Sequence, residues 1–224
     1  SGIIGGGMEF PMMTIISGFD QSGDTTLYTV VSHELGHIWV PMVVSVDERR
    51  YGWMDEGTTD YNENRAAADF YPGYDGEREE FDGYLGLART GDESALMRYS
   101  DFLNSMDHHV VYAYQKPASM LITLRHLLGE ETFTRAYQGY LRAWAFKQPK
   151  PWDFFNAFNT ASGQDLSWFW RSFYFETWVL DQSVASVTAG PRGTDIVVRD
   201  VGDAPMPSRV TITTARTPSH RARW

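Results

Sequence analysis

Residues 32–40, SHELGHIWV, contain two histidines four positions apart, with a glutamate directly after the first. On an α-helix, residues four apart share one face with Cβ atoms about 5–6 Å from one another, so His33 and His37 can direct their imidazoles at one point. Imidazole nitrogen is a preferred zinc ligand, and Glu34 is placed to hydrogen-bond a water there without binding the metal itself. The spacing predicts a catalytic zinc site with its own general base.

A catalytic zinc site usually has three protein ligands, and Glu56 is the candidate for the third. Eighteen residues lie between His37 and Glu56, and we expect Glu56 in the first turn of a second helix that crosses the first. An H-E-x-x-H arises by chance in roughly one chain in a hundred, and a glutamate at this one further position lowers that chance about twentyfold. We expect one zinc ion per chain, held by His33, His37 and Glu56, although cobalt or manganese could occupy such a site in vitro.

Two more carboxylates follow Glu56 at helical spacing. Asp60 lies four residues after it and Glu63 seven residues after it, on the same face of the predicted helix. Ligating imidazoles usually donate their other N–H to a carboxylate, so Asp60 and Glu63 are predicted to support the histidines. A solvated acidic helix face is the alternative interpretation, above all for Glu63.

Hydrophobic periodicity predicts the elements that position these residues. Residues 1–17 are expected to form one extended strand, which Pro11 confines to a sheet edge. A helix is predicted over residues 25–40, where Pro41 stops or kinks it, and a second from about residue 55 to the Pro-Gly pair that follows Tyr71. After charged turns and short helical pieces at 74–110, further helices are predicted over 116–128, 130–145, 151–161 and 164–176.

After Trp178 the sequence changes to short alternating segments separated by glycine and proline turns, which predicts strands at 183–189, 194–201 and 208–215. The basic segment that follows, 216–224, has no pattern and is interpreted as a disordered tail. We therefore expect one domain over residues 1–178 and the start of a β-rich module, with its tail, over 179–224.

The composition narrows the function classes. The chain has 224 residues, 42% of them hydrophobic and 21% charged, as is typical of a globular domain. Its net charge of -10 argues against nucleic-acid binding, which requires basic patches. No apolar stretch reaches the ~18 residues of a membrane span, and no signal peptide is visible. Cysteine is absent, which excludes thiol chemistry but leaves the compartment open between the cytoplasm and the periplasm or exterior of a bacterium.

The H-E-x-x-H pair with its later glutamate resembles the gluzincins, and more narrowly metallopeptidase family one, the membrane alanyl aminopeptidase and leukotriene hydrolase family. Three further stretches carry the resemblance. GGMEF at 6–10 is similar to the family's G-x-M-E-N motif, with Phe10 in place of asparagine. YAYQKPASML at 112–121 is similar to its Y-x-K segment, and SGQDLSWFWRSFYFETW at 162–178 resembles a late helix of its catalytic domain.

The resemblance implies an α+β, thermolysin-like catalytic domain over residues 1–178 and a zinc-dependent aminopeptidase activity. Glu34 would act as general base for zinc-activated water, and Tyr114 would hydrogen-bond the developing oxyanion. Glu9 would bind the α-ammonium group of peptide substrates that have a free N-terminus. The rest of its motif would line the same substrate site: Gly6, Gly7 and Met8.

Two alternatives stay open at this stage. The same site could serve a gluzincin endopeptidase or an epoxide hydrolase. The family also carries an N-terminal β domain before this point, so the chain is expected to be an excised catalytic domain with that β domain as its missing partner. It could then be an inactive or partner-dependent fragment that binds zinc or peptide without turnover.

Overall fold

The computed structural model describes residues 6–19, 23–103, 105–191, 193–214 and 217–223. The chain divides into two compact units, Ser1–Leu166 and Ser167–Trp224. Helices dominate the first unit and β-hairpins the second, so the α+β class expected from the sequence is confirmed. In the part of the chain that is described, no helix combines the length and apolar character needed to cross a bilayer.

The first unit begins with a β-hairpin. Strands β1 (Gly7–Phe10) and β2 (Met13–Ile16) pair antiparallel, with Phe10 opposite Met13. The single strand predicted over 1–17 is therefore wrong for residues 6–17, and residues 1–5 lie outside the described ones. Pro11 and Met12 form the turn, and Met12 has a φ of 67°. Proline followed by a residue with positive φ is typical of a type II turn, where glycine usually follows the proline. Methionine stands at that position here, so the sequence does not predict the turn.

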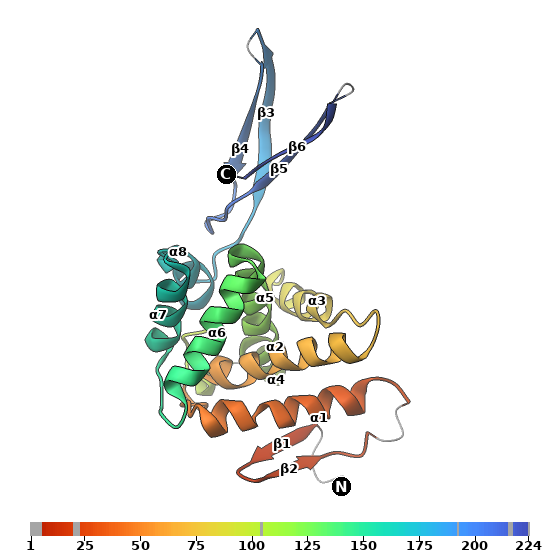
Figure 1. Cartoon of the computed structure of the whole chain (residues 1–224), viewed down its shortest axis with the longest axis vertical. Helices are drawn as coiled ribbons and strands as arrows, with labels where there is room; N and C mark the ends of the chain where they lie inside the picture. Colours follow the sequence, from red (N-terminus) through yellow and green to blue (C-terminus); the bar gives the residue numbers. More distant parts are fainter. Residues whose placement is uncertain (1–5, 20–22, 104, 192, 215–216, 224) are drawn as a thin grey trace. The chain divides into compact units, whose positions relative to one another are not determined.

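Helix α1 (Thr26–Gly36) carries the H-E-x-x-H motif and ends earlier than predicted. A π-helical segment, η1 (Ile38–Val43), follows it, and Val40 within that segment has extended backbone angles (φ -136°, ψ 119°). The predicted break before Pro41 is thus confirmed, because the residue before a proline avoids helical angles. In Figure 1, α1 lies between the β1–β2 hairpin and the next helix.

Helix α2 (Gly52–Phe70) begins three residues before the predicted start and carries Glu56. It crosses α1 where Gly36 faces Thr59, since a Cβ on Gly36 would lie 3.0 Å from Cγ2 of Thr59. The missing side chain lets the two helix backbones approach closely. This crossing brings the last turn of α1 over the first turns of α2.

The remaining helices of the first unit support α2. Three of them confirm predicted helices to within one residue. They are α5 (Lys116–Leu128, predicted 116–128), α6 (Glu130–Trp144, predicted 130–145) and α7 (Pro151–Ser162, predicted 151–161). The region expected to hold only short helical pieces contains a longer helix, begun by the side-chain cap of Asp75 on the backbone N–H of Arg78. The region from 74 to 110 contains α3 (Gly76–Ala88), η2 (Ser100–Phe102) and α4 (Met106–Val110), and the π-helical η3 (Val111–Gln115) follows it.

Aromatic side chains form the core that fixes α2. Trp53 is 1% exposed, and its ring stacks on Phe155 of α7 with centroids 5.9 Å apart. Phe133 of α6 packs against Phe158 of α7 at 5.4 Å and against Tyr61 of α2 at 5.4 Å. Complete burial of each such side chain stabilises the fold by about 1.5–3 kcal/mol. The helix that carries Glu56 is therefore held rigidly.

The second unit begins with α8 (Ser167–Trp170) and the π-helical η4 (Arg171–Phe175), in the place of the single helix predicted over 164–176. Two antiparallel hairpins follow: β3 (Gln182–Gly190) with β4 (Gly193–Asp200), and β5 (Arg209–Thr214) with β6 (Thr217–Arg223). The three predicted strands are confirmed. The prediction of a disordered tail is wrong for residues 217–223, which form β6 and pair with β5. Such a pair is held by backbone hydrogen bonds and needs no apolar pattern in the sequence.

Candidate metal centre

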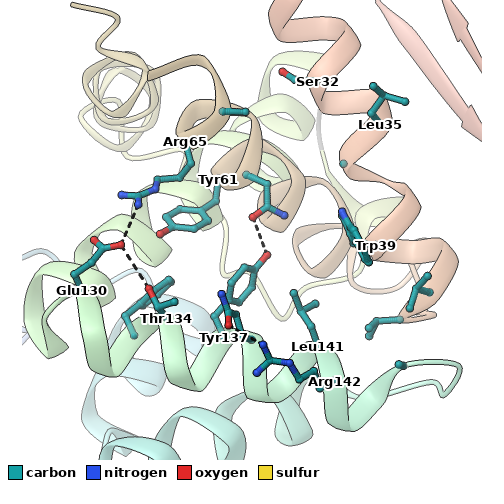
Figure 2. Close-up of a pocket in the computed structure, with 18 residues that line it drawn as sticks. Ser32, Leu35, Trp39, Tyr61, Arg65, Glu130, Thr134, Tyr137, Leu141 and Arg142 are labelled. Atoms are coloured by element: carbon teal, nitrogen blue, oxygen red, sulfur yellow. Dashed lines mark hydrogen bonds and ion pairs between the residues drawn. The ribbon is translucent and has the colours of Figure 1, made fainter. Parts of the chain in front are cut away.

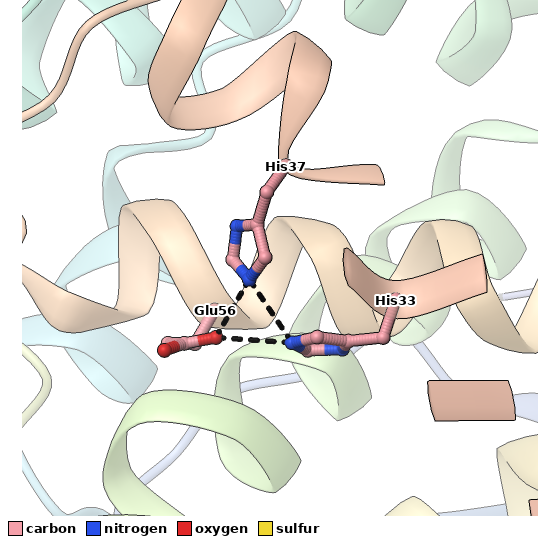
Figure 3. A group of neighbouring side chains, drawn as sticks. All are labelled: His33, His37 and Glu56. Carbon is pink, nitrogen blue, oxygen red and sulfur yellow. Dashed lines mark hydrogen bonds and ion pairs between the residues drawn. The ribbon is translucent and has the colours of Figure 1, made fainter. Parts of the chain in front are cut away.

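Three side-chain atoms from α1 and α2 form an almost equilateral triangle (Figure 3). Nε2 of His33 and Nε2 of His37 are 3.1 Å apart, and Oε2 of Glu56 lies 3.1 Å from the first and 3.2 Å from the second. Tetrahedral zinc with bonds of ~2.0–2.1 Å separates its ligand atoms by about 3.3 Å. Both the donor types and the spacing therefore fit one zinc ion with little rearrangement.

Carboxylates from α2 hold the outer nitrogen of His33. Its Nδ1 lies 2.9 Å from Oδ1 of Asp60 and 3.1 Å from Oε2 of Glu63. Burial by itself lowers the pKa of His33, but the hydrogen-bonded carboxylates of Asp60, Glu56 and Glu63 outweigh it and raise the pKa far above its usual value. An Nδ1–H donated to these carboxylates leaves the Nε2 lone pair directed at the centre of the triangle.

His37 has different partners for its outer nitrogen. Its Nδ1 lies 2.9 Å from the carbonyl oxygen of Val40, which leaves the helix at that point, and 3.0 Å from Oδ1 of Asp55. Burial lowers the pKa of His37, but Asp55 and Glu56 raise it to about 10. Asp55 is not predicted from the sequence, because it directly precedes Glu56 and so lies off the helix face that carries Asp60 and Glu63.

The centre holds more anionic groups than cationic ones. Burial raises the pKa of Asp55 to about 7 in spite of its hydrogen bond with His37. Burial would also raise the pKa of Glu56, but its hydrogen bonds with the two histidines lower it to about 2. Buried carboxylates are costly unless a cation balances them, so the charge balance here favours a divalent metal.

Glu34 lies between the triangle and the β1 strand. It is 5% exposed, and no described residue hydrogen-bonds its Oε2. Burial raises the pKa of its carboxyl group, although the two histidines oppose the shift. A Cβ on Gly7 would lie only 2.2 Å from Oε1 of Glu34, so glycine is required there. The lack of a side chain at position 7 lets β1 approach the candidate base.

Glu9 is the residue of the GGMEF segment that the structure brings to the centre. It is buried, and its carboxylate belongs with Glu34 and His37 to one group whose polar atoms lie within 4.8 Å of one another. Side chains alternate along a strand, so Met8 lies on the opposite face of β1 from Glu9. Gly6 precedes the strand with a φ of 86°, which few other residues adopt easily.

Tyr114, on η3, contacts two residues of the centre. Its hydroxyl donates a hydrogen bond to Oε1 of Glu56 over 2.7 Å, and its ring stacks on that of His33 with centroids 5.8 Å apart. Burial, with the carboxylate of Glu56 beside it, raises the pKa of Tyr114, so the hydroxyl keeps its proton. A Cβ on Gly57 would lie 2.3 Å from Cγ of Pro117, so this glycine lets the segment of Tyr114 approach α2.

A cavity of about 470 Å³ opens beside Glu56. Asp55, Glu48 and His109 line it, and the His109 ring lies 6.2 Å from that of Tyr114. Neither Glu48 nor His109 is among the site residues predicted from the sequence. The only available signal for His109 was its position five residues before Tyr114.

A larger cavity, of about 800 Å³, lies between α1, α2 and α6 (Figure 2). It is lined by Leu35 of α1 and Trp39 of η1, but by neither of the two histidines. Two of its charged side chains pair with each other, as Nη2 of Arg65 donates to Oε1 of Glu130 at 3.0 Å. Of these two cavities, the smaller one is therefore the one that borders the metal centre, through Asp55 and Glu56.

Comparison with known sequences gives a consistent result. A family model described as the peptidase family M1 domain matches residues 6–173. Leukotriene A-4 hydrolase of Xenopus laevis is 28% identical over 150 residues, which cover 63% of this chain and 25% of that protein. Leucine aminopeptidase 2-1 of Meyerozyma guilliermondii is 25% identical over 161 residues, 66% of this chain and 26% of that protein. The chain thus spans about a quarter of the length of these relatives.

Solved structures show the same fold. Aminopeptidase A of Legionella pneumophila, crystallised with aspartic acid, aligns with a TM-score of 0.65 and 16% identity over 98% of this chain and 27% of its own. An M1 zinc metallopeptidase of Deinococcus radiodurans, crystallised as a mutant with a Tyr-Ser-Ala substrate, aligns with a TM-score of 0.57 and 20% identity over 73% of this chain and 35% of its own.

Proposed function

This chain belongs to peptidase family M1, and on that premise we propose that it is the catalytic domain of a zinc-dependent aminopeptidase. Its substrates would be peptides with a free N-terminus, from which it removes the first residue. The observation that supports this most directly is the triangle of ligand atoms from His33, His37 and Glu56, with Glu34 and Glu9 beside it. Several relatives, such as the one from Meyerozyma guilliermondii, are named as aminopeptidases.

His33, His37 and Glu56 would hold one zinc ion per chain. When bound, zinc would supply Lewis acidity, which makes a water molecule easier to deprotonate and a carbonyl carbon easier to attack. Asp60 and Glu63 on one side, and Asp55 on the other, would keep both imidazoles oriented through their Nδ1 atoms.

Glu34 would act as the general base. Its buried carboxylate would accept a proton from the attacking water and later deliver that proton to the leaving amine. A base that must both take up and release a proton works best when its pKa lies near the working pH. The upward shift that burial gives the pKa of Glu34 is in the direction this role needs.

Tyr114 and Glu9 would bind two groups of the N-terminal substrate residue, its carbonyl oxygen and its α-ammonium group. The Tyr114 hydroxyl keeps its proton and would donate a hydrogen bond to the oxygen of the scissile carbonyl as negative charge develops there. One such donor typically lowers the barrier by ~2.7–4 kcal/mol. Glu9 would pair with the α-ammonium group and so set the distance from the N-terminus to the bond that is cleaved.

The domain arrangement is part of the same proposal. Residues 1–178 would form the thermolysin-like catalytic domain, and residues 179–224 would begin a β-rich module. The N-terminal β domain found in this family would be its intramolecular partner and would contribute further to substrate binding.

The test is hydrolysis, by the zinc-loaded chain, of an aminoacyl amide with a free amine beside its N-acetylated twin. Cleavage of the free amine alone is the expected result. Equal cleavage of both substrates would point to an endopeptidase. Cleavage of neither, with zinc shown to be bound, would mean that turnover requires the partner domain.

A further inference from the structure

The cavity beside the candidate metal centre contains a carboxylate that the proposed mechanism leaves unused. Glu48 lies in the connection between η1 and α2 and lines this cavity together with Asp55 and Glu56. Asp55 and Glu56 also form, together with Glu9, a group of carboxylates whose oxygens lie within 4.8 Å of one another. Glu48 and Glu9 therefore share Asp55 and Glu56 as neighbours, and they are close enough for the charge of Glu9 to act on Glu48.

Asp55 and Glu56 pair with the histidines of the centre, but in the described part of the chain Glu9 and Glu48 have no cation of their own. Among the ion pairs formed by the described residues, none involves Glu9 or Glu48. Arg49 also lines the cavity, but its side chain is 84% exposed and lies 3.7 Å from Asp101. Partial burial, followed by the nearby charges of Glu9 and Glu56, raises the pKa of Glu48. Neighbouring carboxylates of this kind are stabilised by a cation placed between them.

The carboxylate of Glu34 gives a second indication that a polar group binds beside Glu9. Oε2 of Glu34 is buried, and no described residue donates a hydrogen bond to it. Glu34 belongs to the same group of polar atoms as Glu9. Buried carboxylate oxygens are nearly always satisfied in folded proteins, so this one indicates a polar group bound next to Glu34, within the group that also contains Glu9 and His37.

We propose that Glu48 supplies a second carboxylate, beside Glu9, for the α-ammonium group of the peptide substrate; this inference rests on the proposed aminopeptidase function. An ammonium group has three N–H donors that point in different directions, so a carboxylate on β1 leaves donors free. Glu48 approaches from the connection before α2 and is placed to accept one of them. It thereby acts as a substrate-binding residue that favours peptides with a free N-terminus.

Binding measurements on the zinc-loaded full chain test this inference, with Glu34→Gln as the parent so that peptides are not cleaved. Calorimetry compares a leucyl tripeptide, its N-acetylated twin and a lysyl tripeptide. Adding Glu48→Gln is expected to weaken binding of both free-amine peptides on the order of tenfold, because glutamine keeps a hydrogen-bond acceptor but loses the negative charge that strengthens its bond to an ammonium group. Binding of the acetylated peptide stays unchanged. With Glu34 intact, Glu48→Gln raises KM more than it lowers kcat.

Asp47→Asn is the matched control, since Asp47 is the neighbouring exposed carboxylate and Asn can still accept the N–H of Arg50. It is expected to leave all three affinities unchanged, and thermal melting checks that both variants fold. An unchanged affinity in Glu48→Gln overturns the inference, as does a loss confined to the lysyl peptide, which would assign Glu48 to the N-terminal side chain. A parent that fails to distinguish free from acetylated peptide overturns the proposed function as well, so the two failures are separable.

Discussion

The Tyr114 hydroxyl donates a hydrogen bond to Oε1 of Glu56 over 2.7 Å, while Oε2 of the same carboxylate faces both candidate zinc-binding histidines. Tyr114 thus contacts the candidate metal ligand Glu56 through the carboxylate oxygen that is not part of the triangle. The hydroxyl could serve the reaction by binding the oxyanion, or it could serve the metal by fixing the orientation of Glu56. These two roles predict different consequences when the hydroxyl is removed.

Tyr114→Phe separates them. If the hydroxyl binds the oxyanion, kcat falls on the order of 10²–10³-fold, while KM and zinc affinity change little, because the lost interaction is made mainly in the transition state. Steady-state kinetics and a zinc titration against a chromophoric chelator give the three quantities. A rise in KM alone, or a loss of zinc affinity as large as the loss of kcat, would contradict the oxyanion role.

Glu34→Gln is expected to keep one zinc per chain and to lose turnover by about 10²–10⁴-fold, since glutamine cannot accept the proton from water. The amide has nearly the shape of the carboxylate and fits the same space beside Gly7. Metal analysis and single-turnover kinetics measure the two effects. Glu131→Gln makes the same chemical change on the exposed surface of α6 and should have no effect. Turnover near the wild-type rate in Glu34→Gln would exclude it as the base.

Zinc binding should release protons, because zinc requires neutral imidazoles. In the metal-free chain, hydrogen-bonded carboxylates raise the pKa of His33 and raise that of His37 to about 10, so both favour the protonated form at pH 7. Since their Nε2 atoms are only 3.1 Å apart, we expect a release of at least one proton per zinc. Calorimetry in two buffers of different ionisation enthalpy measures this number, and zinc affinity should fall as the pH is lowered. A release of zero would show that both histidines are already neutral.

Spacing along two helices is enough to anticipate how His33, His37 and Glu56 converge, because helix geometry is regular and Gly36 permits the crossing. The same reasoning places Asp60 and Glu63 next to His33. Asp55 could not be found in this way, since its contact with His37 depends on how far α1 and α2 rotate about their axes.

Other features depend on backbone geometry or on tertiary contacts. The hairpin turn requires a positive φ at Met12, which its residue type disfavours. The cavity lined by Glu48 and His109 is assembled from segments that are distant in sequence and carry no common motif. Strand β6 pairs through backbone hydrogen bonds, which a pattern of side chains does not reveal.

Glu80, on α3, is a buried carboxyl group outside the metal centre. It is 9% exposed, and its Oε1 accepts a hydrogen bond from Nδ2 of Asn64 over 2.8 Å. Burial, followed by the charge of Asp60, raises its pKa from 4.5 to about 8, despite the opposing hydrogen bond from Asn64. At pH values between 4.5 and about 8, Glu80 is therefore protonated in the folded chain and ionised in the unfolded chain. This contribution to stability is complete below pH 4.5 and is lost as the pH rises towards 8.

Glu80→Gln is expected to remove this dependence, because glutamine keeps the acceptor for Asn64 and cannot ionise. The metal-free variant should match the wild-type chain in its free energy of unfolding at pH 5 and exceed it at pH 8.5 by roughly 2–4 kcal/mol. Urea unfolding at both pH values measures the difference, and the comparison cancels the titration of the other groups. Glu79→Gln, at the exposed neighbouring position, should show no such gain at pH 8.5. An equal stability difference at both pH values would mean that Glu80 is already ionised in the folded chain at pH 5.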